Sequence, residues 1–318
     1  MRAQRVKKRQ PEMLYKMKTA FEEIVSVEHI GKDENPFALG ELLAKACAEE
    51  LPRAAKDKTR TLLLCVDMQR DFIEGGPLGV AGSVGDTERL TRFIYRNMTK
   101  ITEIAASLDT HSPRQIFHQC WWRGADGQMP APFTVITAKD VKEGRWRPLY
   151  EKEKSEEYLE YLETGGQKQL VIWPYHCIAG TAGCALENQF SNMIHFFSAA
   201  REAGLKKIVK GTLPATEFYG IVSPEYDPGG SYANRELLDD LKRCDKLVIA
   251  GEARDYCVAQ SVLQICEAME KEKKRPEIFI MEDCMSCVGP DAASVSAMYK
   301  EWSDKFSFRI VKSTEEFL

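Results

Sequence analysis

The sequence predicts an α/β protein in which a mostly parallel sheet is covered by helices on both faces. From Thr61 onward, short apolar runs such as Thr61–Val66 and Leu247–Ala250 alternate with longer segments that carry apolar residues at helical spacing. Alternation of strands and helices is typical of repeated β-α-β units with parallel strands. We therefore expect functional side chains at the carboxyl ends of the strands, where sites in such sheets gather.

The individual elements follow from the same periodicity. The expected strands are Thr61–Val66, Lys100–Leu108, Gln169–Trp173, Lys206–Val209, Lys246–Ala250, Glu277–Met281 and Phe306–Val311. The expected amphipathic helices between them are Thr87–Met98, Leu186–Ala203, Asn234–Arg243, Tyr256–Lys271 and Asp291–Ser303. The tryptophan- and proline-containing segment Gln119–Thr164 interrupts this rhythm, and we interpret it as an inserted excursion that could form a wall of a pocket.

Residues 1–60 form a predicted helical N-terminal extension, and residues 61–318 form the main domain. Apolar residues recur at helical spacing in residues 13–24 and again in residues 39–51. The basic run in residues 1–10 is typical of a solvated tail. The extension is too short for a core of its own, so we expect it to pack against the main domain or a neighbouring subunit.

Composition excludes several classes of protein. The formal net charge of −4 gives no basis for binding the phosphate backbone of nucleic acids. The apolar runs are too short to span a membrane, and the N-terminus has no charged-then-apolar signal segment. The ten cysteines fall mostly within predicted strands and helices, unlike those of a secreted disulfide scaffold. We expect a cytoplasmic protein with reduced thiols.

Cys257 is the candidate nucleophile. The stretch Lys246–Gln260 predicts a buried strand, a turn at Gly251 and then a helix with Cys257 in its first turn. Exposed N–H groups at a helix start favour a thiolate, and α/β enzymes present nucleophiles in this way. A small apolar cysteine packed under the helix is the alternative.

Asp67 and Lys210 are candidate partners of this cysteine. Asp67 stands at the exit of the first predicted strand, where a carboxylate is costly to bury unless it is paired or functional. Lys210 closes the fourth strand and, if close, would lower the thiol pKa and offset the charge of Asp67. Because no histidine is available as an obvious base, Asp67 is the candidate general base and acid, with Lys210 as its charge partner.

A second group of residues indicates a metal site. Asp109 and His111 follow the second predicted strand, His118 lies seven residues beyond His111, and His176 follows the third. One carboxylate with imidazoles suits a divalent transition metal, zinc first and iron or manganese as alternatives. A set of this kind that leaves positions open for water is typical of a catalytic metal.

These motifs together resemble the isochorismatase-like cysteine hydrolases, and within them the nicotinamidases. The resemblance covers about residues 60–312 and consists of motifs in a fixed order: Asp67-x-Gln69, Asp109-x-His111, Trp173-Pro-x-His176-Cys, Lys210-Gly and Ala253-x-Asp255-Tyr-Cys257-Val. It implies a three-layer, Rossmann-like, six-stranded parallel sheet and a triad of Cys257, Asp67 and Lys210. It also implies a homo-oligomer and a metal held by Asp109, His111 and His176, with His118 a further candidate ligand.

The resemblance further implies how the site treats its substrate. A cis peptide before Ala253 would direct the N–H groups of Ala253 and Cys257 together as an oxyanion hole. Phe72 and Trp173 match positions that flank the substrate ring in nicotinamidases. We expect Gln69 and Tyr256, in the same motifs, to contact the substrate as well.

The expected activity is hydrolysis of a small carboxamide to an acid and ammonia through a thioester, with nicotinamide as the leading substrate. The alternatives are another small amide, such as a carbamoyl or ureido compound, and a non-catalytic ligand-binding homologue. Arg70, Glu252 and Arg254 depart from the usual motifs, and Glu217 and Glu225 are additional charges. Such charges could recognise a polar amide or an amino-bearing acid.

Overall fold

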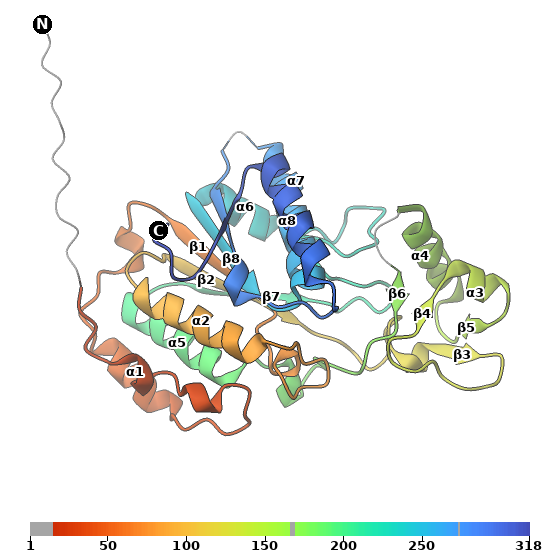
Figure 1. The fold of residues 1–318 in the computed structure, drawn as a ribbon, viewed down its shortest axis with the longest axis horizontal. Helices are drawn as coiled ribbons and strands as arrows, with labels where there is room; N and C mark the ends of the chain where they lie inside the picture. Colours follow the sequence, from red (N-terminus) through yellow and green to blue (C-terminus); the bar gives the residue numbers. More distant parts are fainter. Residues whose placement is uncertain (1–14, 166–168, 273) are drawn as a thin grey trace, which may run out of the picture.

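A computed structural model describes residues 15–165, 169–272 and 274–318 and contains one central parallel sheet (Figure 1). Within these ranges the sheet has six strands in the order β10-β9-β8-β1-β2-β7. The strands are β1 (Thr61–Val66), β2 (Glu103–Asp109), β7 (Leu205–Lys210), β8 (Lys246–Gly251), β9 (Glu277–Met281) and β10 (Arg309–Val311). The predicted α/β class and parallel sheet are confirmed.

The central strand β1 shows why the sheet must be covered on both sides. It pairs in parallel with β2 and β8, with Leu63 opposite Ile104 and Val248. All six of its residues are buried. Because side chains alternate between faces, Leu62 and Leu64 join one apolar cluster, whereas Leu63 and Cys65 join another on the opposite face.

Helices supply the other half of each cluster and make three layers (Figure 1). Helices α2 (Ser83–Arg96) and α5 (Asn188–Arg201) cover one face. Helices α6 (Arg235–Arg243), α7 (Ala259–Glu270) and α8 (Ala292–Phe306) cover the other. Each was predicted within a few residues of its bounds, because its apolar stripe is regular.

The N-terminal extension packs on the outside of the α2–α5 layer. Helix α1 (Leu39–Cys47) lies against α5, and its Leu42 and Ala46 share a core cluster with the main domain. The helix expected over residues 13–24 is wrong where the structure describes it: the chain makes a short 3-10 turn at Phe21–Glu23 and another at Val27–His29. The β-branched residues Ile24, Val25 and Val27 disfavour a longer helix. Met13 and the basic run of residues 1–10 lie outside the described residues.

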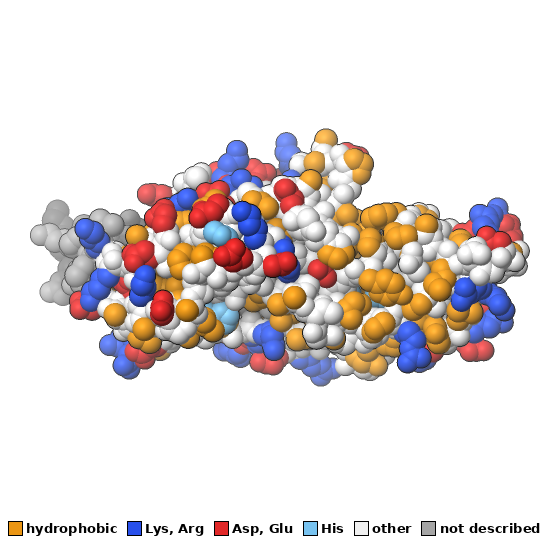
Figure 2. All heavy atoms as spheres, turned by 90° about the horizontal axis from the view of Figure 1, so that it is seen from below, with side chains coloured by type: hydrophobic (Ala, Val, Ile, Leu, Met, Phe, Trp, Pro, Cys, Tyr) orange, Lys and Arg blue, Asp and Glu red, His pale blue; other side chains and the backbone are white. Residues whose placement is uncertain are grey.

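The excursion forms a small lobe beside the carboxyl edge of the sheet (Figure 1). It contains β3 (Trp122–Gly124), β4 (Val135–Ile136), α3 (Ala138–Lys142), β5 (Trp146–Pro148) and α4 (Lys152–Gly165). Figure 2 shows hydrophobic side chains over this end of the molecule, where Phe133 is 59% and Met129 49% exposed.

One predicted strand does not belong to the central sheet. Gln169–Trp173 contains only β6 (Leu170–Val171), which pairs antiparallel with β4 of the excursion. An apolar run does not reveal its partner, and Pro174 stops this one early. The segment that follows β6 therefore carries His176 to the site from the excursion rather than from a strand of the sheet.

Two further observations concern membrane-spanning helices and the state of the cysteines. No helix in the described part of the chain is long and apolar enough to cross a membrane. All ten cysteines are free thiols.

Candidate active site

The candidate residues converge at the carboxyl edge of the sheet. Asp67 directly follows β1, Asp109 ends β2, Lys210 ends β7 and Cys257 follows β8. In the strand order, β8 and β2 flank β1, with β7 beyond β2. Parallel pairing brings these four chain ends to one edge of the sheet, as predicted, although they are separated by up to 190 residues in sequence.

Lys210 is the centre of the charge network. Its Nζ lies 2.9 Å from Asp67 Oδ2 and 3.2 Å from Asp109 Oδ1. The same Nζ lies 3.6 Å from Cys257 Sγ and donates to the carbonyl of Phe218 at 3.2 Å. Although burial opposes its charge, Asp109 and Asp67 raise the pKa of Lys210 well above its ordinary value. Lys210 is therefore a fixed cation shared by two carboxylates and a thiol.

Asp67 is held in one orientation by its neighbours. The Ser107 hydroxyl donates to Asp67 Oδ1 at 2.5 Å and accepts from the Asp67 N–H at 2.9 Å. The backbone of Asp67 takes a φ of +51°, a strained value for a non-glycine residue that turns the chain sharply at the strand exit. Burial raises the pKa of Asp67, while Lys210 and Ser107 oppose the shift. Raised basicity next to a thiol suits a proton acceptor.

Cys257 lies in a π-helical turn, Arg254–Val258, that leads into α7. A π turn is uncommon and often marks a functional position. The peptide bond before Ala253 is trans, so the expected cis peptide is wrong. Ala253 instead takes a left-handed conformation with φ +60° and ψ +61°, and this conformation makes the reversal into the turn. Its carbonyl accepts from Tyr256 N at 2.9 Å and Val258 N at 3.1 Å.

The environment of Cys257 favours the thiol over the thiolate. Burial raises the pKa of Cys257 well above its ordinary value; Lys210 lowers it, and Asp67 and Asp109 raise it further. This direction is opposite to the thiolate expected from the helix start, because burial and two carboxylates act against one ammonium and a short turn. A base must remove this proton, and the Asp67 carboxylate and Cys257 Sγ lie within 4.8 Å of each other.

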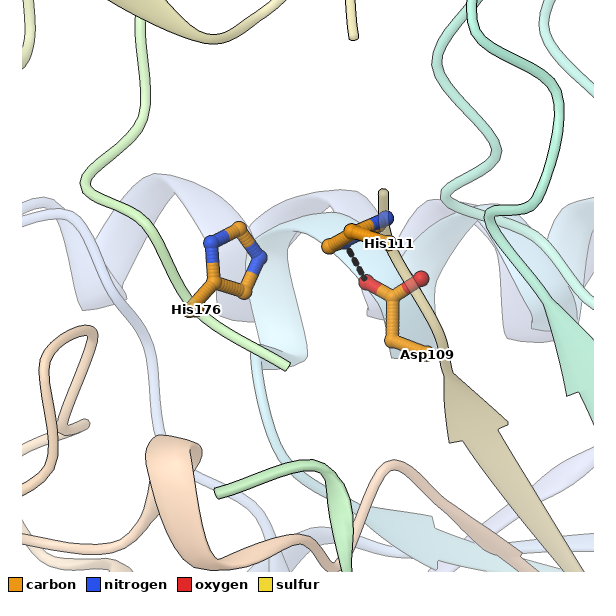
Figure 3. A group of neighbouring side chains, drawn as sticks. All are labelled: Asp109, His111 and His176. Carbon is orange, nitrogen blue, oxygen red and sulfur yellow. Dashed lines mark ion pairs between the residues drawn. The ribbon is translucent and has the colours of Figure 1, made fainter. Parts of the chain in front are cut away.

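Asp109, His111 and His176 form a group that could hold a metal ion (Figure 3). One ligand atom from each lies within 4.8 Å of the others, and all three side chains are buried. Asp109 and His111 come from the end of β2, and His176 faces them from the opposite side (Figure 3). His111 Nε2 lies 3.0 Å from Asp109 Oδ2.

The donor atoms of this group fit a divalent transition metal. His111 Nδ1 lies 3.1 Å from the carbonyl of Gly211, and His176 Nδ1 lies 2.8 Å from the carbonyl of Pro174. Backbone carbonyls on Nδ1 favour the tautomer with the proton on Nδ1 and a lone pair on Nε2, the usual outer shell of metal-binding histidines. In His111 this Nε2 faces Asp109 Oδ2 at 3.0 Å. Burial, together with His111, lowers the pKa of His176 to about 3, so its ring is the neutral form that metals bind.

His118 stands apart from this group. Its ring centroid lies 6.0 Å from that of His111 and 6.4 Å from that of His176. Its Nδ1 lies 3.2 Å from the carbonyl of Pro113, and its buried Nε2 has no hydrogen-bond partner among the described residues. The group of possible metal ligands contains the other three predicted residues and not His118.

Two glycines make room for the site. A Cβ on Gly211 would lie 2.2 Å from Asp109 Oδ1 and 2.7 Å from His111 Cε1, and its φ is +76°. A Cβ on Gly251 would lie 2.1 Å from the carbonyl oxygen of Val66, at a φ of +138°. Side chains at these positions would displace the metal group or separate β8 from β1.

A pocket opens above the cysteine. Asp109, His111, His176, Glu217 and Cys257 are the ionisable residues of its lining, and Ala253 is also part of its wall. The predicted substrate-contacting residues Phe72, Trp173 and Tyr256 are among its apolar lining, together with Leu78, Phe117, Phe218, Tyr219 and Val288. A mostly apolar pocket with a few convergent polar groups is typical of a small-molecule site.

Gln69 lies outside the lining of this pocket. Its Nε2 donates to the carbonyls of Asp109 at 2.7 Å and Cys184 at 2.8 Å, and its Oε1 accepts from Asp109 N at 2.7 Å. These bonds hold the end of β2 in position. The geometry therefore favours a positioning role over the predicted substrate contact.

Two residues at this site were not predicted as site residues. Ser107, which orients Asp67, is the one polar residue in the apolar run Ile104–Leu108, and that signal could have identified it. Glu217 lines the pocket wall with 1% of its surface exposed. Only its presence in an unusual stretch marked Glu217 in the sequence, because its contacts are distant along the chain.

Solved structures of nicotinamidases share this fold. Yeast nicotinamidase Pnc1p matches with a TM-score of 0.56 at 18% identity, over 79% of this chain and 99% of that one. A nicotinamidase/pyrazinamidase from Acinetobacter baumanii matches with a TM-score of 0.54 at 19% identity, over 81% and 99%. PnC1 of L. infantum in complex with nicotinate gives 0.52 at 16% identity, over 83% and 96%.

The sequence itself matches no family model and no curated protein. At these identities the structural likeness establishes the isochorismatase-like hydrolase fold.

Proposed function

We propose that this protein is a metal-containing cysteine amidohydrolase that cleaves a small carboxamide to an acid and ammonia, with nicotinamide as the leading substrate. The observation that carries the proposal is the position of Lys210 Nζ, 2.9 Å from Asp67 Oδ2 and 3.6 Å from Cys257 Sγ. A base and a fixed cation thus lie next to a nucleophile that lines a pocket.

The first half of the reaction forms a thioester. Asp67 removes the proton from the Cys257 thiol, and Sγ attacks the carbonyl carbon of the amide. The backbone N–H of Cys257, in the turn before α7, is the candidate donor to the oxyanion. The Ala253 N–H would join it only through the expected cis peptide, and that peptide is trans. The C–N bond then breaks, and Asp67 returns the proton to the departing ammonia.

The second half releases the acid. Asp67 takes a proton from a water molecule, and the resulting hydroxide attacks the thioester carbonyl. The C–S bond breaks, the proton returns to Cys257, and the acid leaves. Lys210 keeps its charge throughout and stabilises the Asp67 carboxylate and the developing thiolate.

Asp109, His111 and His176 would hold the metal. A metal bound there supplies a Lewis acid that orients the substrate and polarises bound water. Phe72 supports this arrangement, because its ring packs edge-on against His176 with centroids 5.4 Å apart. It limits the rotation of that imidazole and forms part of the pocket wall.

Nicotinamide leads because the fold is that of nicotinamidases and the pocket is lined by aromatic rings that suit a flat substrate. The resemblance also leads us to propose a homo-oligomer, which light scattering would measure.

The test is ammonia release from a panel of small amides that begins with nicotinamide and includes carbamoyl and ureido compounds. We expect turnover by the metal-loaded protein and no turnover by Cys257→Ala. Cys47→Ala removes an exposed thiol far from the pocket and is the matched control. Turnover by Cys257→Ala would contradict the nucleophile assignment. No turnover of any amide would favour a non-catalytic ligand-binding homologue.

A further inference from the structure

Glu217 places a buried carboxylate in the wall of the pocket. Its Oε2 accepts from the Tyr158 hydroxyl at 2.8 Å, and its Oε1 accepts from Trp173 Nε1 at 3.3 Å and from the Tyr219 hydroxyl. A carboxylate offers about four lone-pair positions, so these three donors leave it room for one more. Because Glu217 lines the pocket, a ligand in the pocket could supply the fourth donor.

The charge of Glu217 has no cationic partner among the residues that the structure describes. Within residues 15–165, 169–272 and 274–318, no lysine, arginine or histidine forms an ion pair with it. Burial raises the pKa of Glu217 to about 7; its three hydrogen bonds oppose the shift, and the nearby Glu225 adds to it. A buried carboxylate without a counter-charge is costly unless something else compensates it.

Aromatic rings stand next to this carboxylate in the pocket. Trp173 and Tyr256 meet edge to face, with centroids 5.2 Å apart and planes at 89°. Tyr219 and Tyr256 lie 5.4 Å apart. Ring faces attract cations, and an aromatic wall with a carboxylate is a suitable receptor for an alkylammonium group. The polar end of the pocket, at Cys257 and the metal group, has a different chemistry.

We propose that Glu217 is the specificity-determining residue of this pocket and that the preferred substrate carries a cationic nitrogen in addition to its carboxamide. This inference rests on the proposed amidohydrolase function and narrows its substrate: nicotinamide is neutral near pH 8 and would not use the charge of Glu217, so an amide with a cationic nitrogen should bind more tightly. The carboxamide would lie at Cys257, and the ammonium group would lie against Tyr256 and Tyr219 and donate to Glu217. The substrate class is thus an amide of an amino-bearing acid.

A purely structural role for Glu217 makes a different prediction. If Glu217 only anchors Tyr158, Tyr219 and Trp173, its replacement should weaken charged and neutral ligands alike. Glu217→Gln keeps the shape and removes the charge. Tyr158→Phe removes one anchoring donor and keeps the charge, and Tyr158 is absent from the pocket lining. Comparing the Glu217→Gln and Tyr158→Phe variants therefore separates recognition of the ligand's charge from anchoring of the neighbouring side chains.

The experiment measures binding to the metal-loaded Cys257→Ala protein by calorimetry at about pH 8, where Glu217 is mostly ionised. The ligands are meta- and para-aminomethylbenzamide and the neutral meta- and para-ethylbenzamides of the same shape. We expect at least one aminomethyl compound to bind about tenfold or more tightly than its neutral counterpart. Adding Glu217→Gln should remove most of that advantage, and adding Tyr158→Phe should preserve it.

Equal affinities for charged and neutral ligands, or no binding of either, would overturn the proposal. The proposal would also be overturned if Glu217→Gln left the tighter binding of the charged ligand unchanged. It would be overturned as well if Glu217→Gln weakened the binding of charged and neutral ligands equally. The protein with Cys257 intact is assayed in parallel for ammonia release. The protein could release no ammonia and still prefer charged ligands in a way that depends on Glu217. That result would reject the amidohydrolase function and leave the cation specificity standing.

Discussion

The Lys210 ammonium and the Asp67 carboxylate form an ion pair with no exposed side-chain surface, with Nζ 2.9 Å from Oδ2. Lys210 also faces Asp109 Oδ1 at 3.2 Å, so two buried acids share one cation. Removing one partner of such a pair leaves uncompensated charge in a medium that cannot solvate it. The network therefore couples the stability of the sheet edge to the chemistry of the pocket.

Lys210→Met should lower the free energy of unfolding by about 3–5 kcal/mol, because two carboxylates lose their cation. Urea denaturation at neutral pH measures the loss. The deficit should shrink as the pH falls, because protonation neutralises Asp67, whose pKa is raised by burial. Lys207→Met is the control on the same strand, since Lys207 is exposed; it should change stability by less than about 0.5 kcal/mol. Equal effects of the two variants would contradict the role of Lys210.

Metal content should depend on His111 and His176 and not on His118. His111→Ala and His176→Ala each remove one of three donor atoms that lie within 4.8 Å of one another. Each should weaken metal binding by about tenfold or more. Elemental analysis after dialysis against a limiting free-metal buffer measures the bound ion.

His118→Ala and His195→Ala are the matched controls for this measurement. His195 lies on α5, and its Nδ1 contacts the carbonyl of Ser191 at 2.7 Å. Both variants should retain wild-type metal content. Loss of metal in His118→Ala would return His118 to the ligand set, and full content in both His111→Ala and His176→Ala would remove the metal from the proposed function.

Glu217 should make stability depend on pH. The groups that face it are the hydroxyls of Tyr158 and Tyr219, the indole of Trp173 and the carboxylate of Glu225. Burial raises the folded-state pKa of Glu217 to about 7, from 4.5. Folding therefore favours the neutral acid: the group carries no penalty below the unfolded pKa, and the penalty grows as the pH rises from 4.5 towards 7.

The comparison with Glu217→Gln isolates this contribution, because the other titrating groups cancel. Relative to wild type, the variant should gain roughly 3–4 kcal/mol in free energy of unfolding between acidic and alkaline pH. Urea denaturation of both proteins across that range provides the measurement. Parallel pH profiles would mean that the carboxyl does not titrate in this window.

The sheet was predictable because its strands are locally determined. β1 and β9 begin and end where their apolar runs do, and α6 and α8 follow regular apolar stripes. The edge of a parallel sheet then brings strand exits together, so Asp67, Asp109, Lys210 and Cys257 could be grouped without knowing any distance. Their positions confirm that grouping.

The predictions that failed concern features that depend on contacts between distant parts of the chain, which the sequence does not record. The partner of Leu170–Val171 is β4, about 35 residues earlier in the chain, and periodicity is silent on pairing. The protonation of Cys257 follows from burial by several elements rather than from its own helix. Glu217 meets Tyr158 and Trp173 across 59 and 44 residues, so its environment is visible only in the folded chain.

The N-terminal extension should contribute to the stability of the main domain rather than fold separately. Leu42 of α1 is 2% exposed and packs in the cluster that contains Leu63 of β1 and the aromatic residues of α5. Leu42→Ala should therefore cost about 2–5 kcal/mol, the usual range for a cavity in a core. Leu39, in the same helix, is 52% exposed, and Leu39→Ala should change stability by less than about 0.5 kcal/mol. Chemical denaturation followed by fluorescence of the tryptophans, which lie in the excursion and main domain, makes the comparison. A single transition shifted only by Leu42→Ala is expected, whereas an unshifted tryptophan transition would show that the extension unfolds independently.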